Sequence, residues 1–287
     1  AASDLAQEAA SLNGSISSDG GDAVTASGFR WGTASDLSDA QDLAGSGTSG
    51  AFTGNLTGLT AGTTYYYTAF GTNAEGTAYG DTLSFTTPVP PFTCGSSAVT
   101  FDGHDYATVE IGSQCWFAEN LRSTSYNDGG AIQSGLNDAA WSSGTVGGAV
   151  SVSDEGGADE AANLEDYGRL YNWYAVNTGK LCPSGWHVPT DSEWTTLTDQ
   201  LGSEAGAKLK SDSPAWDGTN SSGFSGLHGG KREDDGSFSF EGIDGYWWSS
   251  TSGATGAWSR LLGSNLDIVL RNDIDSRYGY SIRCVQD

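Results

Sequence analysis

Residues 181–194 read LCPSGWHVPTDSEW and bring together a cysteine, a Pro-Ser-Gly turn, a Trp-His-Val run and a helix start. Thr190 and Glu193 have the spacing of a capping box, in which the hydroxyl accepts a backbone N–H and the carboxylate reaches back. Apolar residues then recur at i, i+3 and i+7 on one face: Trp194, Leu197 and Leu201. Gly202 is a suitable helix stop. The stretch predicts a buried strand end that leads into a short amphipathic helix.

The composition is typical of a turn-rich β protein. The 287 residues suffice for two modest domains, each with its own core. The chain contains 42 Gly but only 6 Pro, together with 10 Trp and 12 Tyr, which favours large aromatic core residues in a β fold. The net charge is −24, from 36 acidic and 12 basic residues. Because such a field repels nucleic acid and anionic lipid headgroups, we expect neither as a partner.

Several features indicate a secreted protein. No apolar run is long enough to cross a bilayer, so we expect no transmembrane segment. The chain begins Ala-Ala-Ser and has no methionine, from which we expect that a signal peptide has been removed. The four cysteines lack CxxC spacing, which argues against zinc and thioredoxin-like chemistry and favours two structural disulfides in an oxidising compartment. They are Cys94, Cys115, Cys182 and Cys284.

Residues 1–87 predict a β-sandwich, because short β-prone runs alternate with Gly, Ser, Asp and Asn turns. Within LTGLTAGTTYYYTAFGTNAEG, at 56–76, alternation leads to Tyr65, whose hydroxyl is placed to bond back to the corner that it leaves. This region resembles a fibronectin type III-like module of bacterial surface proteins. It implies an immunoglobulin-like sandwich.

The first strand of this sandwich is in question. Modules of this type usually open with an additional edge strand, whereas here only AASDLAQEAA, at 1–10, precedes the run SLNGSISSDGG. A sandwich that lacks its first strand has an open edge, which strand donation by a neighbouring subunit would close. In the alternative, AASDLAQEAA supplies a poor but sufficient edge. Both interpretations stay open at this point.

A proline-rich linker separates the two predicted domains. Three of the six prolines lie in TTPVPPFT, at 86–93, and consecutive prolines favour an extended, semi-rigid spacer. We therefore place the linker at 88–93 and the second domain at 94–287. In that domain Tyr167–Val176 carries apolar residues at helical spacing, and β-type runs return near the C-terminus. These runs are 245–251, 257–262, 266–270 and 278–285.

Four segments of the second domain carry a family resemblance. They are IGSQCWFAENL, YGRLYNWYAVNTGKLCPSGWHVPTDSEWTTL, GYWWSST and YGYSIRCVQD. Together they resemble the Fibrobacter succinogenes major paralogous domain family, which is similar to the C-type-lectin-like fold. The resemblance implies an α+β domain, with two helices beside a mixed, mostly antiparallel sheet and long loops above it. It also implies a bacterial extracellular surface protein, lipid-anchored or secreted.

The cysteine pairing follows from this resemblance. Four cysteines allow three pairings. The resemblance implies Cys94–Cys115, which closes the N-terminal hairpin, and Cys182–Cys284, which ties the second helix region to the final strand. Loop closure predicts a stabilisation of roughly 3 kcal/mol for the short loop and nearer about 5 kcal/mol for the long one.

We expect no enzymatic activity. His104, His187 and His228 lie far apart in the sequence, and each has a structural explanation. Once both disulfides form, no cysteine is left as a nucleophile. The sequence has no GxSxG, no HExxH and no phosphate-binding glycine loop. The fold is also similar to the formylglycine-generating enzyme family, whose activity needs free active-site cysteines.

A candidate ligand or interface face comes from the same resemblance, because C-type-lectin-like domains bind ligands through loops near their last strands. The candidate residues are Trp247, Trp248, Trp258, Arg260, Arg271, Asn272 and Arg277. On a strand, one of two adjacent tryptophans faces the core and the other faces away. An exposed tryptophan would serve as a glycan platform, whereas a second covering layer would bury it.

Calcium is the one cofactor that the sequence suggests. Acidic residues with an asparagine in a loop can hold Ca²⁺ through oxygen ligands, and Asp273 and Asp275 are the candidates. The Glu-Pro-Asn and Trp-Asn-Asp motifs of calcium-dependent sugar-binding members are absent. We favour a solvated, salt-bridged strand pair as the explanation of the charged residues.

These observations predict a secreted, non-enzymatic structural protein of the bacterial cell surface. We expect it to self-assemble into a filament or coat through its N-terminal module, as a homo-oligomer or polymer. The alternative is an adhesin that binds glycans or surface proteins through the lectin-like loops. Assembly predicts a polymer, whereas an adhesin predicts a monomer with a ligand.

Overall fold

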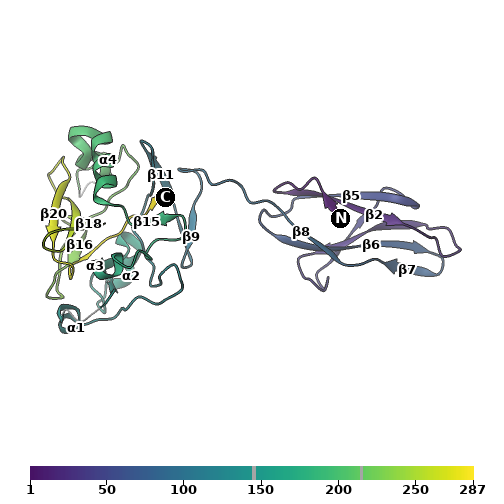
Figure 1. Ribbon diagram of the computed structural model, residues 1–287, viewed down its shortest axis with the longest axis horizontal. Coiled ribbons are helices and arrows are strands. Elements are labelled where there is room, and N and C mark those ends of the chain that lie inside the picture. The colour runs from purple at the N-terminus through teal and green to yellow at the C-terminus, as the bar shows by residue number, and fades with distance from the viewer. Residues whose placement is uncertain (144–146, 214–215) are drawn as a thin grey trace. The chain divides into compact units, whose positions relative to one another are not determined.

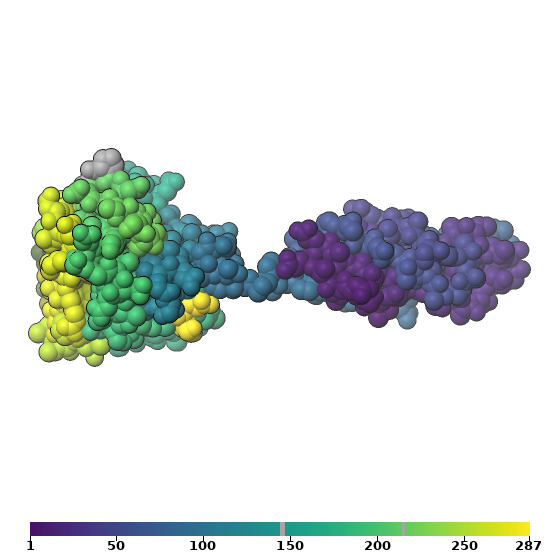
Figure 2. All heavy atoms as spheres, turned by 90° about the horizontal axis from the view of Figure 1, so that it is seen from above, coloured from purple at the N-terminus to yellow at the C-terminus, as the bar shows by residue number. Residues whose placement is uncertain are grey.

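The computed structural model describes residues 1–143, 147–213 and 216–287. Contacts divide the chain into two compact units, unit 1 (Ala1–Phe92) and unit 2 (Thr93–Asp287) (Figure 1). In Figure 2 unit 1 carries the purple and blue part of the colour scale, and unit 2 carries the remainder. Strands predominate in both units. None of the described helices is long and apolar enough to cross a membrane.

Unit 1 consists of two antiparallel sheets. The first has the strand order β1-β2-β5, with β1 at Ala2–Ser3, β2 at Ala9–Ile16 and β5 at Gly50–Thr57. The second has the order β4-β3-β6-β7, and β8 also pairs with β6. Its strands are β3 (Ala26–Gly32), β4 (Gln41–Ala44), β6 (Thr64–Asn73), β7 (Gly76–Tyr79) and β8 (Leu83–Thr86).

Side chains from both sheets of unit 1 share one core, as in a β-sandwich. Leu12 and Phe52 come from the first sheet, Phe29 and Tyr67 from the second, and all four are buried. The Tyr65 hydroxyl accepts a 2.9 Å hydrogen bond from the backbone N–H of Thr60. This is the bond back to the corner that the alternating pattern predicts.

The N-terminal segment supplies only a very short edge strand. β1 pairs Ala2 with Leu12 and Ser3 with Ser11, whereas β5 pairs with the whole of β2. The Asn13 side-chain amide donates to the Ala1 carbonyl at 2.8 Å, and among the described residues this is the last hydrogen bond between the N-terminal segment and β2. Beyond it Gly14–Ile16, which we call the open β2 edge, meets no strand on its outer side within the described residues. Of the two alternatives, a poor edge is present, but it leaves much of β2 uncovered.

Unit 2 combines two sheets and a hairpin with short helices. The hairpin is β9 (Val99–Phe101) with β10 (His104–Tyr106). The smaller sheet has the order β11 (Thr108–Ile111), β12 (Gln114–Phe117), β22 (Val285–Gln286) and β15 (Trp186–His187). The larger sheet has the order β13 (Val150–Ser151), β14 (Leu170–Asn172), β21 (Gly279–Tyr280), β16 (Gly229–Arg232), β18 (Gly245–Ser252), β19 (Ala257–Leu262) and β20 (Leu270–Ile274), and β17 (Phe238–Glu241) pairs with β16.

The helices of unit 2 are α1 (Asp138–Ser142), α2 (Glu160–Tyr167), α3 (Trp173–Val176), α4 (Asp191–Leu201) and α5 (Ala205–Leu209), with a 3₁₀ turn at Gly202–Glu204. The predicted capping box of α4 is present. The Thr190 hydroxyl accepts the Glu193 N–H, and the Glu193 carboxylate accepts the Thr190 N–H at 2.7 Å. Trp194 and Leu197 point into the core, so the expected amphipathic helix is confirmed.

The expected helix over Tyr167–Val176 is wrong in its middle. Gly168, at φ 74°, ends α2, and the next residues form the buried strand β14. Tyr171 pairs with Tyr280 on one side and with Val150 on the other. A buried strand and a buried helix segment have the same continuous apolar pattern, so periodicity could not separate them. The β run expected at 266–270 likewise begins only at Leu270, with β20.

Both disulfides have the pairing that the resemblance implied. Cys94 bonds to Cys115 in β12, and Cys182 bonds to Cys284, just before β22, each with a Cα–Cα distance of 5.9 Å. The second bond joins the segment before α4 to the final strand. Both bonds lie in unit 2, so unit 1 holds its sandwich together without a disulfide.

Candidate interaction surfaces

Trp247 and Trp248 are both fully buried, which corrects the expectation of an exposed tryptophan on β18. The Trp247 indole N–H donates to Asn120 Oδ1 at 2.9 Å, and its ring packs edge-on against Phe224. On the opposite face, the Trp248 ring stacks on Tyr280 with centroids 4.5 Å apart. Aromatic layers therefore cover β18 on both faces, as in the second alternative, and neither tryptophan can meet a ligand.

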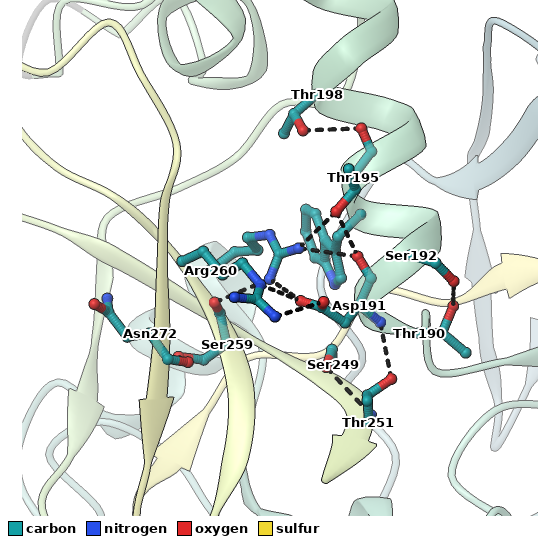
Figure 3. A network of polar contacts seen from close by, with 12 residues as sticks. Thr190, Asp191, Ser192, Thr195, Thr198, Ser249, Thr251, Ser259, Arg260 and Asn272 are labelled. Carbon is teal, nitrogen blue, oxygen red and sulfur yellow. Dashed lines mark hydrogen bonds and ion pairs between the residues drawn. The ribbon is translucent and has the colours of Figure 1, made fainter. Parts of the chain in front are cut away.

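Arg260 is also buried and cannot form part of an exposed face. Its guanidinium lies 2.8 Å from the carboxylate of Asp191, the first residue of α4, and donates to the Asp191 carbonyl at 3.0 Å (Figure 3). Arg271, on β20, reaches the same carboxylate through Nε and Nη2, each at 2.9 Å. Burial opposes ionisation of Asp191, but the hydrogen bonds from Arg271 and Arg260 outweigh it and hold its pKa below the usual value. The network fastens α4 to β19 and β20.

Part of the candidate face remains accessible. The Arg271 guanidinium stacks on the ring of Trp258, 3.2 Å from its centroid, and its side chain is 44% exposed. Asn272 is exposed on the same strand, and Trp258 is partly buried. Arg277 donates to Asp275 and to Asp234, both at 3.0 Å. All three arginines are thus salt-bridged, but not as the solvated strand pair that we favoured, because Arg260 is buried and its partner Asp191 lies in α4.

The two calcium candidates bind the chain's own donors. Asp273 accepts the backbone N–H groups of residues 254–256 at 2.6 to 3.1 Å, and these bonds lower its pKa. Asp275 accepts the N–H and guanidinium of Arg277. In the described parts of the chain, no group of three or more His, Cys, Asp or Glu residues is placed to hold a metal ion.

The three histidines have separate partners. His104 Nε2 lies 2.8 Å from Glu119, and His187 lies between the carboxylates of Asp287 and Glu193. His228 is buried, and its ring packs against those of Trp216 and Tyr167. Each histidine therefore has a local structural setting.

Sequence reasoning missed a groove in unit 1, beside the open β2 edge. The groove measures about 360 Å³ and lies between the end of β2 and the β6–β7 hairpin. Its apolar lining includes Ile16, Val24, Phe52, Phe70 and Tyr79. Asp19 is the single charged residue among its lining residues. Segments far apart in the sequence form this groove, and the only local signal was the run of small residues that follows β2.

Unit 1 is thus a small β-sandwich with an open edge. Unit 2 is a disulfide-bonded domain whose central strand β18 is covered by aromatic residues on both faces. The chain belongs to the Fibrobacter succinogenes major domain family, whose sequence model matches residues 109–286. No curated protein matches the chain.

Several solved structures, among them fibronectin type III domains, are similar to about a third of the chain. The sixth such domain of human fibronectin type III domain containing protein 3 is 21% identical over 32% of this chain and 86% of its own, with a TM-score of 0.28. The FN1–FN3 domains of chicken CNTN1 are 18% identical over 31% of this chain and 30% of theirs, with a TM-score of 0.27. The sensor domain of the anti-sigma factor RsgI4 in Pseudobacteroides cellulosolvens is 14% identical over 36% of this chain and 92% of its own, with a TM-score of 0.23.

Proposed function

We propose that this protein is a secreted, non-enzymatic structural protein of the bacterial surface, and that it self-assembles through unit 1 into a filament or coat. Membership of the Fibrobacter succinogenes major domain family supports the surface role. The two disulfides support an oxidising location outside the cytoplasm, because such bonds are rare in reducing compartments.

The open β2 edge carries the assembly proposal. A strand that lacks a neighbour presents unpaired N–H and C=O groups, which are a template for pairing with another chain. Proteins usually protect such edges with charged residues or proline, and Gly14–Ile16 contains neither. A groove lined by both apolar and polar residues lies beside these backbone groups. Strand addition uses this combination of a backbone ladder and adjacent side-chain pockets.

The non-enzymatic role is supported by what the chain's reactive groups contact. All four cysteines are in disulfides, so none is available as a nucleophile. His187 bonds to two carboxylates that are themselves partly structural, since Glu193 also caps α4. The His228 ring nitrogens have no hydrogen-bond partner among the described residues, but the ring is buried against Trp216 and Tyr167.

We further propose a C-type-lectin-like fold for unit 2. Its larger sheet is mixed, with β16 and β18 parallel and the other pairs antiparallel, and α2 and α4 are its longest helices. The Cys182–Cys284 bond joins the region of the second of these helices to the end of the chain. An experimental structure of unit 2, compared with C-type-lectin-like domains, tests this assignment.

Electron microscopy of the purified chain tests the assembly. We expect extended particles from the intact protein and dispersed monomers from Ser15→Glu, because a carboxylate on the exposed Ser15 disfavours edge pairing. Ser35→Glu, in the exposed β3–β4 loop, is the matched control and should assemble like the intact protein. Dispersed monomers from the intact chain, or equal assembly of both variants, would contradict the proposal.

Adhesion is the second candidate function, and Trp258 is the observation that favours it. Its ring is partly accessible, and the polar Arg271 guanidinium stacks on it. Aromatic rings with neighbouring polar groups suit glycans. Glycan arrays probed with the intact chain and with Trp258→Ala test this role, with and without Ca²⁺. Binding that Trp258→Ala retains in full would exclude this face.

A further inference from the structure

We infer that the groove beside the open β2 edge accepts the uncharged segment Pro88–Phe92 of a second copy of this chain. The inference rests on the proposed self-assembly through unit 1 and names the two surfaces that would meet. One surface is the groove, and the other is the segment that follows β8.

The groove offers both apolar and polar contacts to an extended segment. Its floor reaches Phe52, a core residue, and its rim includes Phe70 and the 55%-exposed Tyr79. The open β2 edge forms one wall and offers backbone donors and acceptors along its length. Aromatic-lined grooves of this kind bind proline-rich segments in other domains, because the rings pack against the flat pyrrolidine faces.

The segment Pro88–Phe92, of sequence PVPPF, has the matching chemistry. Its prolines hold it extended with no internal hydrogen bonds, so little conformational freedom is lost on docking. Proline lacks an N–H but keeps its carbonyl, so this segment would chiefly accept hydrogen bonds from β2. Val89 is 69% exposed and gains the most from leaving water.

A contact between two copies of this acidic chain is favoured where both surfaces carry little charge. The chain carries a net charge of −24, so most of its surface repels a second copy. Asp19 is the one charged residue in the groove lining, and PVPPF has none. The two surfaces therefore meet with little like-charge repulsion.

The positions of the two surfaces within unit 1 favour an open chain of subunits. At one end of β6, Thr64 pairs with Thr86, two residues before the proline segment. At the other end, Asn73 lines the groove together with Gly76, the first residue of β7. A contact between two different patches at opposite ends of a unit is heterologous, and it propagates into a linear polymer.

Two variants, each with a matched control, test the contact by sedimentation velocity of the full chain. Ala78→Glu places a carboxylate in the groove, and Thr77→Glu places it on the neighbouring exposed residue outside the groove lining. Val89→Asp charges the donated segment, and Thr82→Asp charges an exposed loop residue instead. Circular dichroism and thermal unfolding establish that all four variants fold. We expect the first of each pair to stay monomeric and both controls to assemble like the intact chain.

Mixing the two monomeric variants is the decisive step. Ala78→Glu keeps an intact segment and Val89→Asp keeps an intact groove, so their mixture should form a species of twice the monomer mass and nothing larger. A mixture that stays monomeric, or a Val89→Asp variant that assembles like the intact chain, would overturn the inference. If the intact chain assembles and only Ser15→Glu and Ala78→Glu block it, the proposed function stands and a different segment occupies the groove. If the intact chain itself stays monomeric, both proposals fail.

Discussion

At the scale of single residues, His187 makes the stability of unit 2 depend on pH. Its Nδ1 lies 2.7 Å from Asp287 and its Nε2 2.9 Å from Glu193. Burial acts to lower the His187 pKa, but hydrogen bonds and charges from both carboxylates outweigh it and raise the pKa above 6.5. A raised pKa in the folded state stabilises the fold fully below the unfolded value and loses this contribution as pH rises through the folded value.

We therefore expect the free energy of unfolding of unit 2 to fall as the pH is raised from about 6 to about 8. His187→Gln should flatten this dependence, because glutamine keeps hydrogen-bonding capacity without titrating. Urea unfolding at a series of pH values measures both slopes. An unchanged pH slope in His187→Gln would show that other groups control stability in this range.

Arg283 is a second residue whose role is set by burial. It is completely buried, and its guanidinium donates to four oxygens, none of them a carboxylate: Asn120 Oδ1 and the carbonyls of Phe117, Phe224 and Ser225. Burial lowers its pKa to about 9. Only the planar guanidinium of arginine can reach all four acceptors at once, because the lysine ammonium is a single point donor.

Arg283→Lys should cost about 3–5 kcal/mol of unfolding free energy, because it leaves buried acceptors unpaired around a buried charge. Arg271→Lys, at the partly exposed surface pair, should cost less than about 1 kcal/mol. Guanidinium denaturation of the two variants gives the comparison. Similar losses in both would mean that the buried acceptors find other donors.

At the scale of elements, the cap of α4 is the best test of what local sequence determines. Thr190→Ala removes the hydroxyl that accepts the Glu193 N–H, so we expect a loss of about 1 kcal/mol in the unfolding free energy of unit 2. Thr196→Ala, on the exposed face of α4, is the control and should change it by less than about 0.5 kcal/mol. Equal effects would argue against a stabilising cap.

The predictable elements were those whose signals are local. The capping box and Gly202 delimit α4, and alternation ending at Tyr65 locates the corner of unit 1. β14 was missed, because its apolar run acquires strand character only from pairing with β13 and β21. The pattern in β18 shows that adjacent tryptophans face opposite ways, but it does not show that distant aromatic residues cover both faces. Because these distant aromatic residues bury Trp247 and Trp248, neither belongs to an exposed candidate site.

At the scale of the whole molecule, the disulfides should separate the stabilities of the two units. Unit 1 has no cysteine, whereas unit 2 has two bonds with sequence separations of 21 and 102. Loop closure predicts stabilisations of about 3 and about 5 kcal/mol for such loops. We expect reduction to lower the thermal transition of unit 2 and to leave that of unit 1 unchanged. Differential scanning calorimetry with and without reductant measures this, and a joint shift of both transitions would contradict it.

The proposed self-assembly of the whole chain is the central claim, and the sequence indicates it only in outline. The weak edge strand was indicated by the poor strand character of residues 1–10, but the groove depends on how β2 and the β6–β7 hairpin meet. Because a net charge of −24 opposes association, neutral surfaces favour contact between two copies. The geometry of unit 1 places such a surface beside unpaired backbone groups.

Sedimentation velocity of the intact chain over a range of protein concentrations tests this claim most directly, with Ser15→Glu run in parallel. We predict species heavier than the monomer for the intact chain and a single monomer boundary for the variant. A single monomer boundary for the intact chain at every concentration would contradict the account.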